Sequence, residues 1–433
     1  MQVEDWANPD VDALLANKAG TARGAIAPTA PGLEQWSAMP DEPQLGFAEL
    51  LDAVHRCAPG ALPAITTEHA RRLGATDAAL YLVDHEQRHL IPIPDGGPRR
   101  EAVTIDTTVA GRAFRTFEQQ QVTSDGGERL WVPVVDGTER LGVLEVELPD
   151  APTDAIRRHL TTLAGVIAEV IAVKGAYGDI FEQVRRRRPM SLSAELMWQV
   201  LPPRTFATAT VAITAALAPA YELGGDCFDY AVDDAVARFA VFDAMGHGLQ
   251  AGLLSTVALA AYRHARRGGL RLEDSVAAID AAVAAGFPGE RFVTGVVAEL
   301  DLERGVLSWV TAGHPRPLLL RQGKVVKRLD GGAGLPFGLG AGSDACGSEG
   351  LEPDDQLVVF TDGVTEARSA DGMLFGEERL VDFVIRASSA GAPAAETMRQ
   401  LMHAIVDYHH GVLRDDATAV LVEWRGNHHD PGG

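Results

Sequence analysis

Carboxylates recur in the second half of this 433-residue chain, where apolar runs of strand type meet turns. The runs GGDCFDY, VFDAMGHG, LVVFTDG and DDATAVLV carry Asp226, Asp229, Asp243, Asp362, Asp415 and Asp416. Hard divalent cations such as Mn²⁺ or Mg²⁺ prefer oxygen ligands, and scattered carboxylates supply them. Two such cations about 4 Å apart activate a water molecule and stabilise an in-line displacement. The pattern therefore indicates a metal centre that hydrolyses phosphate esters.

Taken singly, each Asp has a simpler interpretation, because an Asp before Gly is most often a turn or cap residue. His247 in MGHG is a candidate proton donor to a departing serine oxygen, or it only orients its loop. His314 in AGHPRPLL has the same structural alternative. No motif indicates a nucleophilic Ser or Cys, so we expect direct attack by metal-bound water. Close backbone approach to metal or phosphate is expected at Gly224, Gly225, Gly246 and Gly248.

The overall charge narrows the class of partner. Lys and Arg number 38 against 60 Asp and Glu, a formal net charge of −22, which disfavours binding to nucleic acid. Three cysteines form no CxxC pair, which suits a reducing compartment. No signal-peptide pattern is present, and no apolar run approaches the ~20 residues that span a bilayer. We therefore expect a cytoplasmic protein without a membrane segment.

Residues 1–43 show no sustained periodicity and are predicted to be disordered. Residues 44–150 read as an α+β unit, with a helix at about Leu62–Leu73 and strands at Ala78–Val83, Leu130–Val135 and Leu141–Leu148. The phrases ATDAALYLVD, TVAGRAF and WVPVVDGTERLGVLEVE resemble a GAF domain. That resemblance implies a sensor of small molecules or a dimerisation unit, although no residue of this segment identifies which ligand it would bind. Cys57 is either a chromophore anchor or a small core residue.

Residues 151–189 are predicted to form a helical linker. Apolar side chains alternate by four and three, interrupted only by Lys174, at Ile156, Leu160, Leu163, Ile167, Val170, Tyr177, Phe181 and Val184. Such a seam is typical of a coiled coil, so we predict a homodimer joined by a parallel stalk. The alternative is one amphipathic helix packed on its own domain.

Residues 190–425 form the second large unit, and residues 426–433 are a flexible tail. Strands are predicted at Thr208–Ala216, Val236–Phe242, Phe292–Leu300, Val306–Thr311, Leu318–Arg321, Gln356–Thr361 and Ala417–Trp424. Helices are predicted at Ser193–Leu201, Leu249–Arg266, Glu377–Ala387 and Ala394–Tyr408. Runs of strands and runs of helices within one unit indicate an α+β fold.

Several segments of this unit occur in a familiar order: YELGGDCFDY, FDAMGHGLQAGLLST, FVTGVVAELD, TAGHPRPLLL, LPFGLG, LVVFTDGVTEAR, FGEERL and RDDATAVLV. They resemble the SpoIIE/RsbU-like branch of the PPM metal-dependent serine/threonine phosphatases. The resemblance implies a β-sandwich of two antiparallel sheets flanked by helices, with two divalent cations, Mn²⁺ or Mg²⁺, at one edge.

The resemblance also assigns roles to residues. It implies that Asp243 bridges both metals and that Asp362 and Asp415 complete one metal shell. It gives the other metal the backbone carbonyl of Ala244 and a water-mediated contact from Asp226. Asp416 stands next to Asp415 and is the alternative ligand.

The expected activity is removal of phosphate from Ser or Thr of a small protein, for which the resemblance implies an anti-sigma-factor antagonist of STAS type. The N-terminal sensor unit would regulate this activity. The alternative is a non-catalytic scaffold that binds protein partners. A scaffold is disfavoured because a dead copy would be expected to lose at least one of Asp226, Asp243, Asp362 and Asp415.

Overall fold

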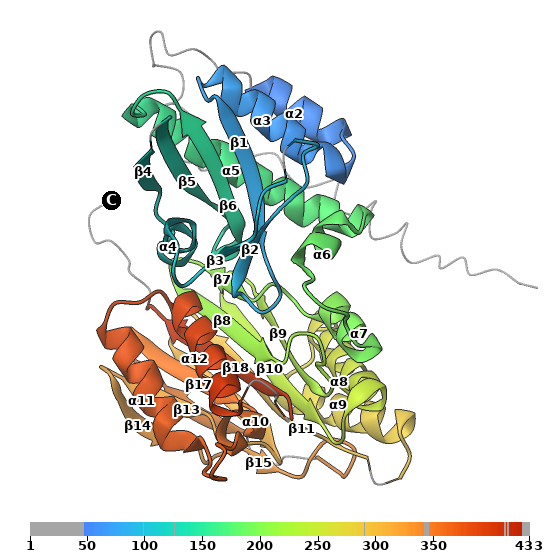
Figure 1. Ribbon diagram of the computed structural model, residues 1–433. Coiled ribbons are helices and arrows are strands. Elements are labelled where there is room, and N and C mark those ends of the chain that lie inside the picture. The colour runs from blue at the N-terminus through green and yellow to red at the C-terminus, as the bar shows by residue number, and fades with distance from the viewer. Residues whose placement is uncertain are drawn as a thin grey trace, which may run out of the picture. The chain divides into compact units, whose positions relative to one another are not determined.

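Three six-stranded sheets organise the part of the chain that the structure describes (Figure 1). The computed structural model describes residues 47–426 except positions 98, 125, 290, 342–345, 411–412 and 414. The predicted disordered segment 1–43 and all but the first residue of the predicted tail lie outside the described residues. From Ala48 on, the chain forms one unit with continuous contacts.

The first sheet has the strand order β3-β2-β1-β6-β5-β4, and every pairing is antiparallel. Its strands are β1 (Asp77–Val83), β2 (His89–Pro92), β3 (Val103–Thr104), β4 (Gln120–Ser124), β5 (Gly127–Asp136) and β6 (Glu139–Leu148). The helices of this region are α2 (Phe47–Arg56), η2 (Pro59–Ala61), α3 (Leu62–Arg72), α4 (Val109–Thr116) and α5 (Asp154–Lys174). The predicted helix at 62–73 and strands at 78–83, 130–135 and 141–148 are confirmed. The specific GAF resemblance stays a prediction.

Strand β1 is buried along almost its whole length because the sheet is covered on both faces. Successive side chains of a strand point to opposite faces. Ala79, Tyr81 and Val83 pack with Phe114 of α4 in one core cluster. The even-numbered residues of β1 face the other side, where α3 and α5 lie against the sheet (Figure 1).

Helix α5 belongs to this sheet and does not continue as a stalk. Leu160, Leu163 and Ile167 are fully buried within a single copy of the chain. The helix ends at Lys174, a 3₁₀ turn η3 (Gly175–Tyr177) follows, and Gly178 is extended before α6 (Ile180–Arg185). The predicted helical linker over residues 151–189 is thus helical in two parts, with a break between Lys174 and Ile180. Leu160, Leu163, Ile167 and Phe181 of the seam are buried within this chain, as the alternative interpretation expects, whereas Tyr177 is 76% exposed. The homodimer remains an untested prediction.

One segment also corrects the expectation about apolar runs. Asp154–Tyr177, 24 residues with a mean hydropathy of 1.4, is long and apolar enough to cross a membrane by length and composition alone. A core helix of a soluble protein passes the same test. The buried residues of α5 pack on the first sheet, as those of a core helix do.

The second sheet has the order β15-β12-β11-β10-β9, with β16 also paired to β12. Its strands are β9 (Asp226–Val232), β10 (Val236–Ala244), β11 (Val293–Asp301), β12 (Val306–Ala312), β15 (Ala333–Gly334) and β16 (Gly347–Gly350). The third sheet has the order β14-β13-β17-β18-β8-β7. Its strands are β7 (Thr205–Ala207), β8 (Val211–Ala218), β13 (Leu318–Arg321), β14 (Lys324–Arg328), β17 (Asp355–Phe360) and β18 (Ala417–Trp424).

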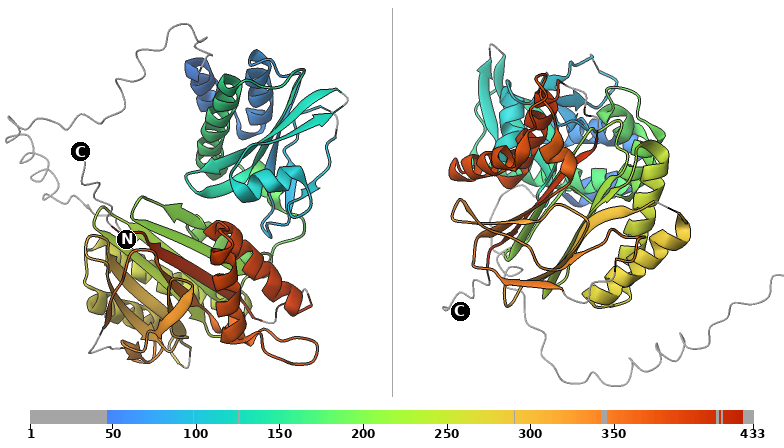
Figure 2. Two further views of the ribbon diagram at one scale, coloured as in Figure 1. Left: turned by 90° about the vertical axis from the view of Figure 1, so that its left-hand side faces the viewer. Right: turned by 90° about the horizontal axis from the view of Figure 1, so that it is seen from below.

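The helices of this region are α7 (Leu192–Val200), α8 (Gly248–Arg267), α9 (Leu272–Gly286), α10 (Asp362–Glu366), α11 (Gly376–Ser389) and α12 (Ala394–Tyr408). Figure 2 shows α8 and α9 on one side of the paired sheets and α11 and α12 on the other. The predicted sandwich of two sheets flanked by helices is confirmed, with one parallel pairing, between β12 and β15. Helix α9 was not predicted.

The alternation along single strands explains this layering. Leu357 and Val359 of β17 join the core between the sheets, whereas Val358 and Phe360 join the cluster that holds α11 and α12. On β10, Phe242 contacts Tyr262 of α8 with ring centroids 6.1 Å apart. The residues on either side of Phe242 therefore face the interior of the sandwich, toward the third sheet.

The burial of α5 generates the first prediction. Leu163→Ala should lower the free energy of unfolding by about 2–5 kcal/mol, because it leaves a cavity in a closed core. Val173→Ala on the same helix, where the side chain is 56% exposed, should change it by less than about 0.5 kcal/mol. Urea unfolding of the full chain measures both. If Leu163→Ala leaves the free energy of unfolding unchanged but converts a dimer to a monomer, the coiled-coil stalk would be supported instead.

Candidate metal centre

Asp226 and Asp243 face each other across two neighbouring strands. Their Cα positions are paired in the register of β9 and β10. Asp243 comes directly after Phe242 on β10, so its side chain points to the opposite face, into the sandwich. Asp226 is its partner on β9 and points to the same face. Asp226 is 1% exposed, and Asp243 is half-buried. Like charges directly opposite each other destabilise a strand pair, so this arrangement requires a compensating group.

The third sheet contributes the other carboxylates. Strand β17 ends at Phe360, Thr361 is the N-cap of α10, and Asp362 is the first residue of that helix. Asp415 and Asp416 directly precede β18, the neighbour of β17. The five aspartates at positions 226, 243, 362, 415 and 416 therefore come from the ends of strands in both sheets.

Two of these carboxylates also organise the backbone. Asp226 Oδ2 accepts a hydrogen bond of 2.7 Å from the Thr361 hydroxyl, which in turn accepts one of 3.0 Å from Thr418 N–H. Asp416 Oδ2 accepts from three successive backbone N–H groups, at 2.7, 2.6 and 3.2 Å, which belong to Gly224, Gly225 and Asp226. Asp416 therefore holds the loop that delivers Asp226. This second role, and that of Thr361, were not predicted.

The electrostatics of the cluster are those of crowded anions. Burial, followed by the charges of Asp243 and Asp416, holds the pKa of Asp226 well above its usual range. Burial, with neighbouring carboxylates next, raises the pKa of Asp243 to about 7. Burial raises the pKa of Asp416 to about 6 although three N–H groups oppose the shift.

Burial also raises the pKa of Asp362 and of Asp415, and these two carboxyls lie at the exposed mouth of the cluster. Within the described residues, none of the five aspartates forms an ion pair with Lys, Arg or His.

The donor set fits hard divalent cations, because its members are oxygen ligands with surplus negative charge. As the side chains are placed, no three His, Cys, Asp or Glu within the described residues already stand in metal-binding geometry. Asp226 and Asp416 instead hold protein donors. Like these two, Asp243, Asp362 and Asp415 have no protein cation within ion-pair distance among the described residues.

Glycines let the backbone close around the cluster. A Cβ on Gly225 would lie 2.6 Å from the carbonyl oxygen of Ala244, the backbone group expected to bind metal. A Cβ on Gly363 would lie 1.9 Å from the carbonyl oxygen of Asp416. Gly246 and Gly248 adopt φ of 103° and 69°, which glycine alone tolerates easily.

The remaining sequence candidates lie around the centre. His247 is the exposed N-cap of α8 and makes no side-chain capping bond. His314 is buried, its Nδ1 lies 3.0 Å from the Thr294 hydroxyl, and burial lowers its pKa to about 3. His314 is therefore neutral and supports the strand next to Asp243. Asp229 forms ion pairs of 2.6 and 3.2 Å with Arg263 and Arg266, which makes it structural.

The raised pKa values predict how stability depends on pH. Because the native carboxyls bind protons more tightly than their usual value of 3.8, stability present at low pH should be lost as pH rises from about 4 to about 7. The urea midpoint of EDTA-treated protein should therefore be lower at about pH 8 than at about pH 5. Asp243→Asn should flatten this difference. If the urea midpoint changes with pH equally in the wild type and in Asp243→Asn, the carboxylate repulsion assigned to Asp243 is contradicted.

Comparison with known proteins gives this region a family. Residues 233–425 match the family model described as Stage II sporulation protein E (SpoIIE). Phosphoserine phosphatase RsbU of Bacillus subtilis is 23% identical over 206 residues, which cover 47% of this chain and 60% of RsbU. Protein IcfG of Synechocystis is 29% identical over 132 residues, 30% of this chain and 20% of IcfG. The chain thus spans a fifth to three fifths of the length of these relatives.

Among solved structures, the SiaA-PP2C domain of Pseudomonas aeruginosa aligns with a TM-score of 0.46 and 21% identity, over 59% of this chain and 99% of that domain. The family match and the observed sandwich agree with the resemblance seen in the sequence motifs. The C-terminal part of this chain is therefore similar to the SpoIIE family over residues 233–425 and to the phosphoserine phosphatase RsbU.

Proposed function

We propose that this chain is a metal-dependent phosphoprotein phosphatase that removes phosphate from Ser or Thr of a small regulatory protein. The observation that carries the proposal is the cluster of five aspartates, which two sheets bring together with no protein cation paired to them in the part of the chain that the structure describes. A scaffold that only bound proteins would have no reason to keep so many mutually repelling carboxyls.

The residues divide into ligands and supports. We assign metal binding to Asp226, Asp243, Asp362, Asp415 and the carbonyl of Ala244, with Asp243 shared between two cations. Bound there, Mn²⁺ or Mg²⁺ would activate water and neutralise charge on the phosphoryl group. The contacts of Asp416 with the loop at Gly224 support a positioning role, which favours Asp415 over Asp416 as the ligand.

The surface beside the centre supports a folded protein as substrate. Met245, Leu249 and Leu253 are 46%, 42% and 44% exposed and repeat every four residues from the end of β10 along α8. This spacing places Leu249 and Leu253 on one face of α8, and Met245 lies in the short loop that leads from β10 into that helix. Arg291 lies beside them, with its Nη2 2.6 Å from Gln250 Oε1. Exposed apolar side chains with an Arg suit an interface that holds a phosphoserine.

RsbU carries the description of a phosphoserine phosphatase. By analogy we propose a phosphorylated anti-sigma-factor antagonist of STAS type as the substrate, in the cytoplasm. The N-terminal sheet domain would regulate the activity as a sensor.

The activity itself is tested by Asp243→Asn. Loss of the charge that two cations share should lower Mn²⁺-dependent hydrolysis of p-nitrophenyl phosphate by roughly 10²-fold or more, about 3 kcal/mol of transition-state stabilisation. Asp274→Asn, an exposed carboxyl paired only with Arg271 nearby, is the matched control and should keep full activity. Wild-type turnover in Asp243→Asn, or in EDTA, would remove the proposal.

The docking surface gives a separate prediction. Met245→Asp should lower kcat/KM toward a phosphorylated STAS-type protein about tenfold, a typical cost for a central interface residue. Hydrolysis of p-nitrophenyl phosphate should not change, because this small substrate does not reach the surface. Leu270→Asp, beyond the far end of α8, is the control. If both substrates lose activity equally in Met245→Asp, the residue supports the centre and does not bind the substrate protein.

A further inference from the structure

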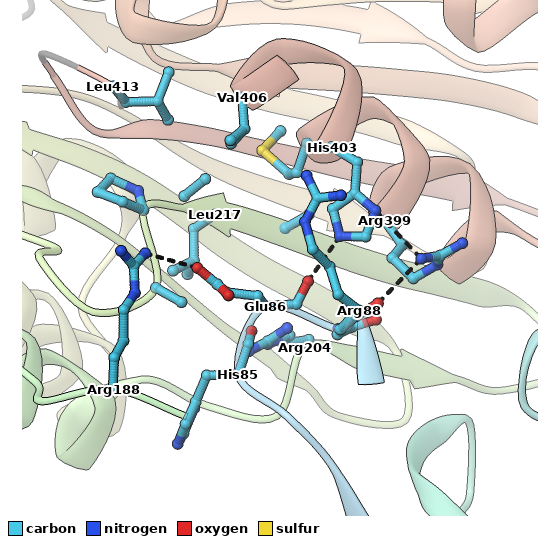
Figure 3. Close-up of a pocket in the computed structure, with 16 residues that line it drawn as sticks. His85, Glu86, Arg88, Arg188, Arg204, Leu217, Arg399, His403, Val406 and Leu413 are labelled. Carbon is cyan, nitrogen blue, oxygen red and sulfur yellow. Dashed lines mark hydrogen bonds and ion pairs between the residues drawn. The ribbon is translucent and has the colours of Figure 1, made fainter. Parts of the chain in front are cut away.

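A small cavity of about 60 Å³ lies away from the metal centre, where the turn after β1 meets the end of β8 and helix α12 (Figure 3). Hydrogen bonds hold its walls together. Arg399 Nη1 donates to the Gln87 carbonyl at 3.0 Å, and His403 Nε2 lies 2.7 Å from the Glu86 carbonyl. The cavity is therefore a built feature of the fold. Nothing in the proposed activity uses it.

The lining is basic although the chain as a whole is acidic. Four arginines and one glutamate line the cavity. Three of the arginines have carboxylate partners: Arg188 pairs with Glu86 at 2.7 Å, Arg88 with Asp407 at 2.9 Å, and Arg399 with Glu396 at 2.8 Å. The fourth, Arg204, has no carboxylate within ion-pair distance among the described residues.

Arg204 is 8% exposed, so its charge is almost fully removed from water. Its Nη2 donates to the His85 carbonyl at 3.0 Å, and its guanidinium lies 4.7 Å from the centre of the Trp198 ring. Burial lowers its pKa to about 10. An unpaired buried charge costs several kcal/mol, which hydrogen bonding to one carbonyl does not offset.

The two carboxylates whose charges act most strongly on Arg204, Glu139 and Asp84, already accept hydrogen bonds from other groups. Glu139 accepts hydrogen bonds from Thr205 N–H and hydroxyl at 2.8 and 3.0 Å. Asp84 accepts from the N–H groups of Arg88 and His89 at 2.8 and 3.1 Å. Protein carboxylates therefore leave the guanidinium of Arg204 without a direct counter-ion.

We propose that this cavity binds a small oxyanion, a phosphate or carboxylate group, with Arg204 as its principal cation and Arg188 at its entrance. The volume holds a few water molecules, which matches such a group. Planar guanidinium groups bind phosphate and carboxylate oxygens through paired hydrogen bonds. Leu217, Pro219 and Met402 form an apolar wall, and this lowers the local dielectric so that each charge interaction is stronger.

The site is also connected to the metal centre along the chain. Ala218, Pro219 and Ala220 line the cavity, and the same segment continues into the Gly224–Asp226 loop that Asp416 holds. Trp198, which packs on Arg204, donates its Nε1–H to the Ala220 carbonyl at 2.8 Å. Binding of an anion would therefore stabilise the segment that delivers Asp226.

The experiment measures binding of inorganic phosphate to the full chain in EDTA, where the metal-free carboxylates repel phosphate. Calorimetry at constant ionic strength should give one saturable site. Arg204→Met should weaken binding by roughly tenfold or more, because it removes the hydrogen bonds that a charged donor makes to the anion. Arg316→Gln, an exposed arginine paired with Asp330, should bind as wild type does. Absence of a saturable site, or equal affinity in Arg204→Met, would overturn the proposal.

A second variant covers the case in which Arg204→Met does not fold. Arg188 is half exposed, so Arg188→Gln should fold and still weaken phosphate binding. Unchanged affinity in Arg188→Gln, when Arg204→Met is unfolded, would equally overturn the proposal. Parallel titrations with glycerol 3-phosphate and acetate identify the source of the oxyanion. If inorganic phosphate binds most tightly, the ligand is the free ion. If glycerol 3-phosphate binds most tightly, it is a phosphorylated metabolite, and if acetate does, it is a carboxylate.

Discussion

The pairing of Asp226 with Asp243 across β9 and β10 is the constraint on which the rest of the catalytic region depends. One of these carboxyls is buried and the other half-buried at the edge of the sandwich, and among the described residues no protein cation pairs with either. The surroundings offset this repulsion with directed dipoles. The Thr361 hydroxyl binds one carboxyl, and three backbone N–H groups bind the neighbouring Asp416. Such a site gains stability from divalent cations that bind only the folded state.

The layered fold makes this pairing possible. Both sheets of the sandwich are buried on their two faces, and this burial fixes the register of their inner strands. On β10, for example, Phe242 packs against α8 on one face, and the neighbouring residues pack into the core between the sheets on the other. Strand ends from two sheets meet at the same edge, and polar groups placed there reach each other without disturbing the core. The close approach of Gly225 to Ala244, and of Gly363 to Asp416, shows how tightly the backbone is folded around the carboxyls.

Much of this arrangement was readable in the sequence, because Asp residues stood where apolar strands ended. The predicted strand Leu318–Arg321 and helix Ala394–Tyr408 have the same bounds in the structure. Helix α9 was missed although Leu272, Val276, Ile279 and Val283 carry the helical spacing.

Other features could not be predicted from the sequence. Periodicity along α5 indicates an apolar face but does not say whether that face meets another chain or the domain's own sheet. The choice between Asp415 and Asp416 depends on which one the Gly224 loop reaches, and adjacent residues share every local signal. Arg204 looks like any surface arginine until its burial is known.

The most direct measurement is anomalous diffraction from crystals of the full chain soaked in Mn²⁺. We predict two peaks at the sandwich edge, with Asp243 in contact with both, Asp362 and Asp415 around one of them, and the Ala244 carbonyl at the other. Asp416 should keep its bonds to the backbone of the Gly224 loop. Peaks at other acidic residues, or no peak beside Asp243, would contradict the proposal that this cluster is a two-metal phosphatase centre.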